Sequence, residues 1–213
     1  QKDLLMHVTF FENHIIIIAL TLFFISYLIG SIPFGLILTH LWGYGDIRRV
    51  GSGNIGATNA LRTGSKLLAF LVLFLDAFKS FFIIKVFKFF DYSKDLEILI
   101  FIILIGCIIG HCYPVWLKFR GGKGVATILG GLIGINLSIG ILIGSIWLFV
   151  IFIFKKSSLS SLLSISCLPI VIFIFYGFYE LIFSILLFVI ICFRHKDNIK
   201  RILKSEEPNV FGK

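Results

Sequence analysis

The chain has 213 residues, of which 58% are hydrophobic and only 15% charged, and it contains 25 phenylalanines. Soluble domains are roughly 45–50% apolar, so this composition, with a mean hydropathy of +1.04, excludes an ordinary soluble protein and indicates an integral membrane protein. The net charge of +9 is scattered among the ends of apolar runs. Cytoplasmic positive charge and anionic lipid explain it better than nucleic acid does.

Apolar runs recur along the whole length, so we expect one integral membrane domain over residues 1–213. The first run, residues 15–41, is longer than a signal-peptide core and is expected to stay as a span. Residues 1–13 then form a short extracytoplasmic tail. The polar breaks that separate the runs fall at residues 42–66, 91–97, 111–124, 155–161 and 194–213.

Two apolar segments, 124–154 and 159–193, are each too long for one comfortable span and are interpreted as pairs. This predicts an all-α polytopic fold with seven transmembrane helices. One face then carries fifteen of the twenty Lys and Arg residues. By the positive-inside rule that face is cytoplasmic, with the N-terminus outside and a cytoplasmic C-terminal segment, 194–213. A five-span arrangement is the alternative.

The first polar segment on this face is GSIPFG (30–35) followed by VGSGNIGATNALR (50–62). Glycine lets backbone amides approach a ligand, Ser and Asn offer neutral hydrogen bonds, and Arg forms a bidentate fork to phosphate. The segment is a candidate oxyanion site, and an ordinary solvated loop is the alternative.

A charged pair, Asp76 and Lys79, lies about ten residues inside the second span at i, i+3. Charges at this depth are costly and usually face a bundle interior or a polar cavity. Substrate binding and mutual neutralisation without chemistry are both open.

The second polar segment is GHCYPVWLKFRGGKGVAT (110–127), in which Gly121, Gly122 and Gly124 flank Lys123 just before a helix resumes. Backbone N–H groups at a helix N-terminus together with a lysine can bind an anion. The pattern is not a Walker A loop, so ATP binding is not supported. A flexible basic loop at the lipid headgroups is the alternative.

The third polar segment is FRHKDNIKRILKSEEPNV (193–210). If the last span continues as a helix, His195 and Asn198 turn with the apolar side toward the bundle, while the lysines form an outer stripe. A juxtamembrane basic helix explains the lysines but leaves His195 and Asn198 unexplained.

In order and spacing, these segments resemble the bacterial acyl-phosphate:glycerol-3-phosphate acyltransferases, the PlsY family, from about Leu20 to Val210. The matches are GSIPFG, GSGNIGATNALR, the D-x-x-K of the second span, GHCYPVWLKFRGGKGVAT and RHKDNIKRILKSEE. This chain has FRGGKG where the family usually has FKGGKG, and Ser205 where the family usually has glycine. By motif position Glu207 is the family glutamate, with a structural role.

The resemblance implies that an acyl group passes from fatty acyl phosphate to the sn-1 hydroxyl of glycerol 3-phosphate. The products are 1-acyl-glycerol 3-phosphate and phosphate, and this is the first committed step of bacterial phospholipid synthesis. It also implies a location in the bacterial inner membrane, among phospholipids, with the site facing the cytoplasm and the donor supplied by a separate enzyme. The catalytic residues it implies are Ser52, Arg62, Lys123, His195 and Asn198, with Gly121, Gly122 and Gly124 at the donor phosphate; Asn54, Asn59, Asp76 and Lys79 complete the candidate substrate-binding set.

An acyl phosphate is already activated, so neither a covalent nucleophile nor a metal or other cofactor is required, in keeping with the lack of a compact ligand cluster. The H-x-x-x-x-D motif of thioester-dependent acyltransferases is missing, because no Asp follows His111 at that spacing. The acceptor proton passes either to His195 or to the acceptor's own phosphate, and the resemblance favours the phosphate. A transporter of a phosphorylated metabolite is the alternative function, although no inverted repeat is evident.

Overall fold

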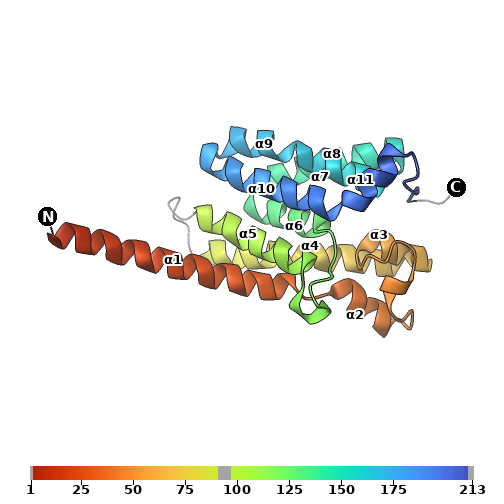
Figure 1. Cartoon of the computed structure of the whole chain (residues 1–213), viewed down its shortest axis with the longest axis horizontal. Helices are drawn as coiled ribbons and strands as arrows, with labels where there is room; N and C mark the ends of the chain where they lie inside the picture. The colour runs from red at the N-terminus through yellow and green to blue at the C-terminus, as the bar shows by residue number, and fades with distance from the viewer. Residues whose placement is uncertain (1, 91–96, 211–213) are drawn as a thin grey trace.

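The computed structural model describes residues 2–90 and 97–210, and over these residues the fold is helical and contains no strand, as predicted (Figure 1). Three short 3₁₀ turns lie between helices: η1 (Ile47–Arg49), η2 (Leu61–Thr63) and η4 (Val115–Leu117). The helices are α1 (Lys2–Gly30), α2 (Phe34–Leu41), α3 (Ala57–Ala60), α4 (Lys66–Phe90), α5 (Glu97–Cys112), α6 (Val125–Ile135), α7 (Leu137–Phe154), α8 (Ser157–Ser166), α9 (Leu168–Phe175), α10 (Phe178–Arg194) and α11 (Lys196–Leu203).

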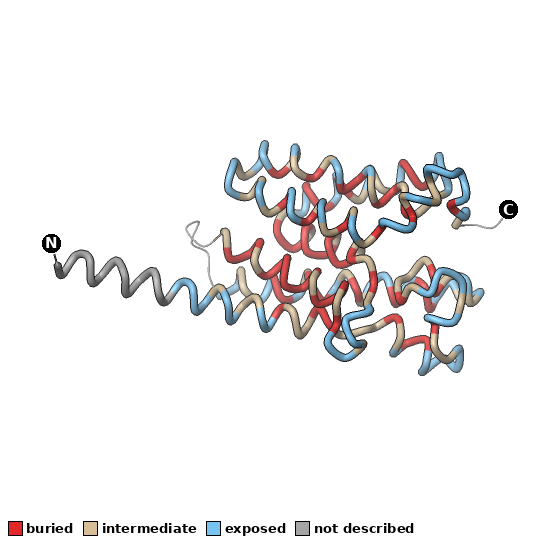
Figure 2. The backbone as a smooth tube through the Cα atoms, in the orientation of Figure 1, coloured by how far each residue is buried: buried red, intermediate tan, exposed pale blue. Residues whose placement is uncertain are grey.

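The long helices form two layers with α6 between them (Figure 1). In one layer α1 packs along α5, and α4 packs along α6; in the other, α7 packs on α8, and α9 on α10. The buried residues concentrate in α5 and α6 (Figure 2), where Ile and Leu side chains build the main core. α2, α3 and α11 lie at the end of the bundle opposite the N-terminus, so the polar segments meet there.

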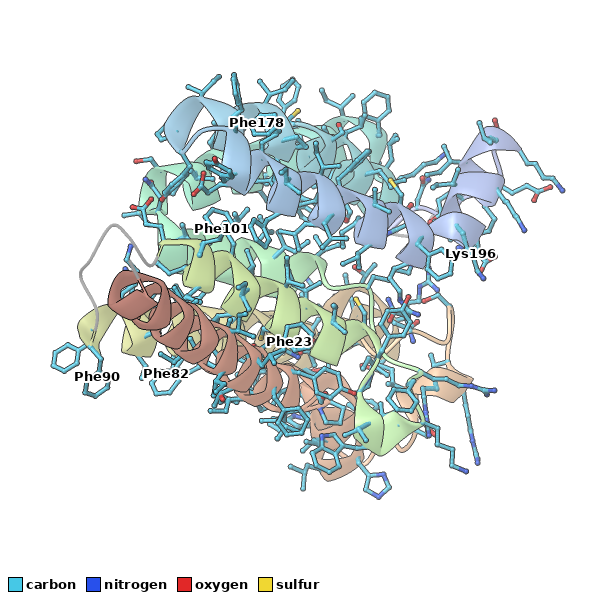
Figure 3. The ribbon with its side chains drawn as sticks, turned by 60° about the vertical axis from the view of Figure 1, so that its left-hand side comes forward. Phe23, Phe82, Phe90, Phe101, Phe178 and Lys196 are labelled. Carbon is cyan, nitrogen blue, oxygen red and sulfur yellow. The ribbon has the colours of Figure 1, made fainter. Side chains whose placement is uncertain are left out.

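The phenylalanines divide between core and outer surface according to their helix face. Phe101 of α5 points toward α10 and is 1% exposed, whereas Phe82 and Phe90 project outward from α4 (Figure 3). Exposed aromatic and aliphatic side chains over most of the outer surface are expected where lipid rather than water is the solvent.

Among the described residues, five helical segments are long and apolar enough to cross a membrane. The pair α10 and α11, bent by 66°, would be a sixth. The seventh predicted crossing corresponds to α6, which has only 11 residues and lies inside the bundle. Since roughly 17–25 residues cross the hydrocarbon core, seven spans stay a prediction, while a multi-span helical protein is established.

The predicted divisions of both long apolar segments are present. Asn136 separates α6 from α7 in an extended conformation, and its side chain accepts from the Ser138 and Ile139 amides, capping α7. Gly177, at φ 116°, separates α9 from α10. The turn in the first segment therefore uses an asparagine cap rather than one of the glycines around it.

The first helix differs from the sequence expectation at both ends. α1 begins at Lys2, so most of the stretch interpreted as a tail is helical and continuous with the span. It ends at Gly30, where Ile32 and Pro33 divide the predicted run 15–41 into α1 and α2. Proline cannot donate an amide hydrogen bond and restricts the residue before it, which ends the helix.

Candidate active site

A cavity of about 620 Å³ lies at this polar end of the bundle, and all three polar segments contribute to it. Most of its remaining lining is apolar, from α4, α6 and α7, and includes Phe70, Leu73, Leu129, Leu148 and Ile151. The cavity therefore joins a cationic polar end to an apolar slot. The predicted site residues that line it are Ser52, Asn54, Asn59, Arg62, Asp76, Lys123, Gly124, His195, Asn198 and Glu207.

The loop before α3 is folded around Asn59, which is 2% exposed. The Asn59 amide group donates to the carbonyls of Ile47, Val50 and Asn54 at 3.0, 2.9 and 2.8 Å. Its Oδ1 accepts from the Ser52 amide at 3.0 Å and from Oγ at 3.3 Å. Asn59 was predicted to bind substrate, but its polar atoms are committed to the loop, so its contribution is to present Ser52.

The glycines near Lys123 are not equivalent. The Gly121 and Gly122 amides donate to the carbonyls of Cys112 and His111, at 3.2 and 3.0 Å. These two amides are therefore paired within the protein, and neither residue lines the cavity; their place at the donor phosphate stays a prediction. A Cβ on Gly122 would lie 2.1 Å from His111 Nε2, so this position admits only glycine.

Gly124 differs from these two glycines because it lines the cavity. It is the N-cap of α6 at φ +84°, a conformation that other residues rarely adopt. It lines the cavity with Val125 and Ala126, so the unpaired N–H groups of the first turn of α6 open onto it. Helix N–H groups and a lysine ammonium are both groups that bind anions, so the place of Gly124 and Lys123 at the donor phosphate stays a prediction.

Lys123 is held by a relay of side chains from the C-terminal segment. Its Nζ donates to Asn198 Oδ1, and Asn198 Nδ2 donates to Glu207 Oε1 at 2.6 Å. The Glu207 carboxylate also accepts from Ser158 Oγ at 2.6 Å and from Arg201 Nε at 2.7 Å. Glu207 is 8% exposed while Glu206 is exposed, which supports Glu207 as the structural glutamate.

These neighbours shift the pKa values of Lys123 and Glu207, which both lie outside the membrane-spanning segments. Burial lowers the pKa of Lys123 to about 8; Glu207 opposes the shift, and the cations of Arg201, Arg194 and Arg62 add to it. Burial alone would raise the pKa of Glu207, but hydrogen bonds from Ser158, Asn198 and Arg201 outweigh it and lower the pKa. At neutral pH the site holds an ammonium that gains by meeting an anion.

His195 lies at the bend between α10 and α11 and is 2% exposed. Its Nδ1 is 2.9 Å from the Ile191 carbonyl oxygen, which can only accept, so Nδ1 carries the proton. In the neutral ring Nε2 is then left as an acceptor at a residue that lines the cavity. The predicted inward orientation of His195 and Asn198 is confirmed, although it depends on a bend rather than on a continuous helix.

Asp76 and Lys79 form a buried cluster with His111. Lys79 Nζ donates to Asp76 Oδ1 at 2.9 Å, lies 2.9 Å from His111 Nδ1 and contacts the Ile32 carbonyl at 3.3 Å. Asp76 and His111 line the cavity but Lys79 does not. The structure therefore does not place Lys79 with the substrate-binding residues, and its charge is compensated inside the protein.

The sequence analysis missed the serines of α8. Ser157, Ser158 and Ser161 line the cavity, and Ser158 and Ser161 are nearly buried. Ser161 Oγ accepts from Trp147 Nε1 at 3.1 Å. The run SSLSSLLS was the available signal, because hydroxyls repeated at i and i+3 or i+4 give an otherwise apolar helix one polar face.

Comparison with known proteins agrees with this geometry. Residues 20–205 match the family described as glycerol-3-phosphate acyltransferase. Glycerol-3-phosphate acyltransferases of Pelagibacter ubique and Ehrlichia canis are 46% and 44% identical, over 85% and 87% of this chain and 92% and 95% of theirs.

Two crystal structures of PlsY (YgiH), an integral membrane glycerol 3-phosphate acyltransferase, are also similar. Its glycerol 3-phosphate form superposes with a TM-score of 0.83 at 35% identity, and its lysophosphatidic acid form with a TM-score of 0.81 at 34% identity. Each comparison covers 90% of this chain and 94% of the other. With a match over nearly its whole length and the same helical arrangement, the chain belongs to the glycerol-3-phosphate acyltransferase family.

Proposed function

We propose that this membrane acyltransferase uses a fatty acyl phosphate as donor and glycerol 3-phosphate as acceptor, and that it releases 1-acyl-glycerol 3-phosphate and inorganic phosphate. The observation that carries the proposal is one cavity in which a cationic polar end continues into an apolar slot. Two substrates that each carry a phosphate, one of them with an acyl tail, match that division.

The donor phosphate is assigned to Lys123 and the first turn of α6, where an ammonium and helix N–H groups converge. The acceptor phosphate is assigned to Ser52 and Arg62, since the guanidinium fork suits a phosphate monoester. The acyl tail then extends between Leu129, Leu148 and their neighbours, toward the hydrocarbon.

In the reaction the acceptor hydroxyl oxygen attacks the acyl carbonyl carbon, a new ester bond forms, and the bond from the carbonyl carbon to the phosphate oxygen breaks. The hydroxyl proton passes to the acceptor's own phosphate. His195 Nε2 and Asn198 orient the hydroxyl, and Lys123 stabilises the negative charge of the departing phosphate. A His195→Gln variant with near-normal kcat and a raised KM would separate this route from one in which His195 is the base.

The same proposal includes the membrane arrangement: one domain over residues 1–213, seven spans with α6 as the short one, and an outside N-terminus. The cavity then opens at the cytoplasmic side of the inner membrane, and a separate enzyme supplies the donor. The meeting of the three basic polar segments at one end of the bundle supports this orientation.

The test is phosphate release from palmitoyl phosphate by purified protein, with and without glycerol 3-phosphate. We expect release that depends on the acceptor and is matched by acylated product. Lys123→Met should lower kcat/KM by about 10²–10³, the usual cost of one donor to a developing anion, whereas the exposed Lys118→Met should not. Phosphate release that ignores the acceptor would overturn the proposal.

A further inference from the structure

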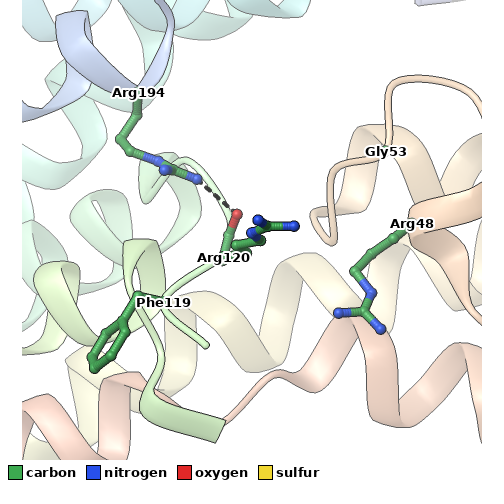
Figure 4. A pocket seen from close by; sticks show the side chains of 6 residues that line it. Arg48, Gly53, Phe119, Arg120 and Arg194 are labelled. Carbon is green, nitrogen blue, oxygen red and sulfur yellow. Dashed lines mark hydrogen bonds between the residues drawn. The ribbon is translucent and has the colours of Figure 1, made fainter. Parts of the chain in front are cut away.

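A second cavity, of about 480 Å³, lies outside the candidate active site (Figure 4). Three arginines from three separate parts of the chain line it: Arg48 from η1, Arg120 from the loop after η4, and Arg194 from the end of α10. Gly53, Phe119 and Gly121 complete its walls. None of these six residues lines the candidate active site.

The two cavities share a wall made of two glycine-containing loops. In the first loop Ser52 and Asn54 line the candidate active site, while Gly53 between them lines the arginine pocket. In the second loop Lys123 lines the active site and Gly121 the pocket. Each loop therefore presents one side to each cavity.

The guanidinium groups of the arginine pocket are only partly used. Arg48 forms a fork with the Asp46 carboxylate at 2.9 and 2.6 Å. Arg194 donates to the carbonyls of Gly122 and Gly121 at 3.0 and 2.8 Å and stacks on Tyr113 at 4.9 Å. Within residues 2–90 and 97–210, the Arg120 side chain has no hydrogen bond or ion pair.

This leaves an excess of positive charge facing one space. Asp46 offsets Arg48, and the hydrogen bonds of Arg194 go to neutral carbonyls, so the charges of Arg120 and Arg194 have no acidic partner among the described residues. Arginine N–H groups match the oxygens of phosphate in planar forks. The volume lies within the roughly 300–1,000 Å³ that small-molecule sites occupy.

We propose that the arginine pocket is a second binding site for a phosphate monoester, with Arg120 as its principal ligand and Arg194 as the link to the active-site loop. Arg194 holds the carbonyls of Gly121 and Gly122, next to Lys123, so an anion on its remaining N–H groups contacts the same loop from behind. Either a soluble glycerol phosphate or the headgroup of a lipid phosphate monoester has the required chemistry.

The test counts bound ligand in nanodiscs. In phosphatidylcholine discs, equilibrium dialysis with labelled glycerol 3-phosphate should give two equivalents for the wild type and one for Arg120→Gln. Lys118→Gln removes a neighbouring exposed cation that does not line the pocket, so it should retain two. An unfolding temperature of Arg120→Gln close to that of the wild type would show that the variant is folded, since typical surface substitutions change stability little.

A second arm separates the two sources. Discs doped with phosphatidic acid, which is a phosphate monoester, are compared with discs doped with phosphatidylglycerol, which is a phosphate diester. Native mass spectrometry of the released protein shows which lipid stays bound. If the wild type binds one equivalent of glycerol 3-phosphate and selectively retains phosphatidic acid, and Arg120→Gln loses that retention, the lipid is the source of the phosphate monoester. One soluble equivalent without such retention, or an Arg120→Gln variant that matches wild type in both arms, would overturn the proposal.

Discussion

Two lysines at the active-site end of the bundle are held in different ways. Lys79 Nζ lies 2.9 Å from the Asp76 carboxylate, whereas Lys123 Nζ contacts the Asn198 amide oxygen, and the Glu207 carboxylate is one side chain further away. A direct carboxylate contact cancels the charge of the ammonium within the protein. An interposed amide fixes the position of the ammonium and leaves its charge for an anion. We therefore expect Lys79 to maintain the structure and Lys123 to be available to the substrate.

The largest effect is expected for Lys79→Met. It leaves the Asp76 carboxylate buried without its cation, so we expect a loss of about 3–5 kcal/mol in the free energy of unfolding. Thermal and denaturant unfolding in detergent would measure it. The matched control is Lys85→Met on the exposed side of the same helix, which should stay within about 0.5 kcal/mol.

A double variant, Asp76→Asn with Lys79→Met, removes both charges and should recover most of that stability. If Lys79→Met alone unfolded like the wild type, the inference that Lys79 maintains the structure would be wrong.

The second test is Glu207→Gln, which keeps the shape of the relay but removes its charge. The charge-assisted hydrogen bonds lost are worth about 1.5–3 kcal/mol, so the free energy of unfolding should fall by about that amount, and kcat/KM should fall because Lys123 is held less firmly. Because Glu207 raises the pKa of Lys123, the alkaline limb of the activity should also move to lower pH. The neighbour Glu206 is exposed, and Glu206→Gln should show none of these effects.

The smallest expected effect is the pH dependence of the native enzyme. Only the ammonium form of Lys123 attracts phosphate, and its pKa is about 8, so kcat/KM should fall about tenfold per pH unit above that value. Phosphate monoesters have their second pKa near 6 and contribute nothing there. A bound anion stabilises the ammonium form of Lys123 and raises its pKa. The alkaline fall of kcat should therefore begin at a higher pH than that of kcat/KM.

Stability should change in the opposite direction over the same window. The pKa of Lys123 is lowered on folding, so between pH about 8 and 10.5 the unfolded state binds more protons and this residue makes folding more favourable as pH rises. Deprotonation of Lys123 therefore does not itself destabilise the fold at pH 9. If Lys123→Arg kept some activity and that activity still fell above pH about 8, a group other than Lys123 would be responsible for the fall.

The sequence predicted those features that depend on local pattern. Apolar runs and their breaks located most helix ends, and charge placement brought Ser52, Lys123 and His195 to one face. It could not show which polar atoms pair with one another. Asn59 and Lys79 carry the same chemistry as true ligands, and only the packing around them shows that their groups are already engaged.

One departure noted in the sequence has a backbone explanation. Ser205, where the resembled family usually has glycine, follows α11 at φ 59°. In that left-handed region a side chain costs about 1–2 kcal/mol, so glycine suits the position. The departure therefore lies in the turn that directs the chain from α11 to Glu207, rather than in the chemistry.

The residues that hold Lys123 lie after the 66° bend at His195, and this late position in the chain has a consequence for biosynthesis. A chain is made from its N-terminus, so Lys123 is inserted before Asn198 and Glu207, which hold it, exist. Asn198 and Glu207 follow α1 to α10 in the chain, and the Val210 amide closes the arrangement on the Lys155 carbonyl at 2.8 Å. A nascent chain paused within α10 would have most of its helices in the membrane and would still lack a working site.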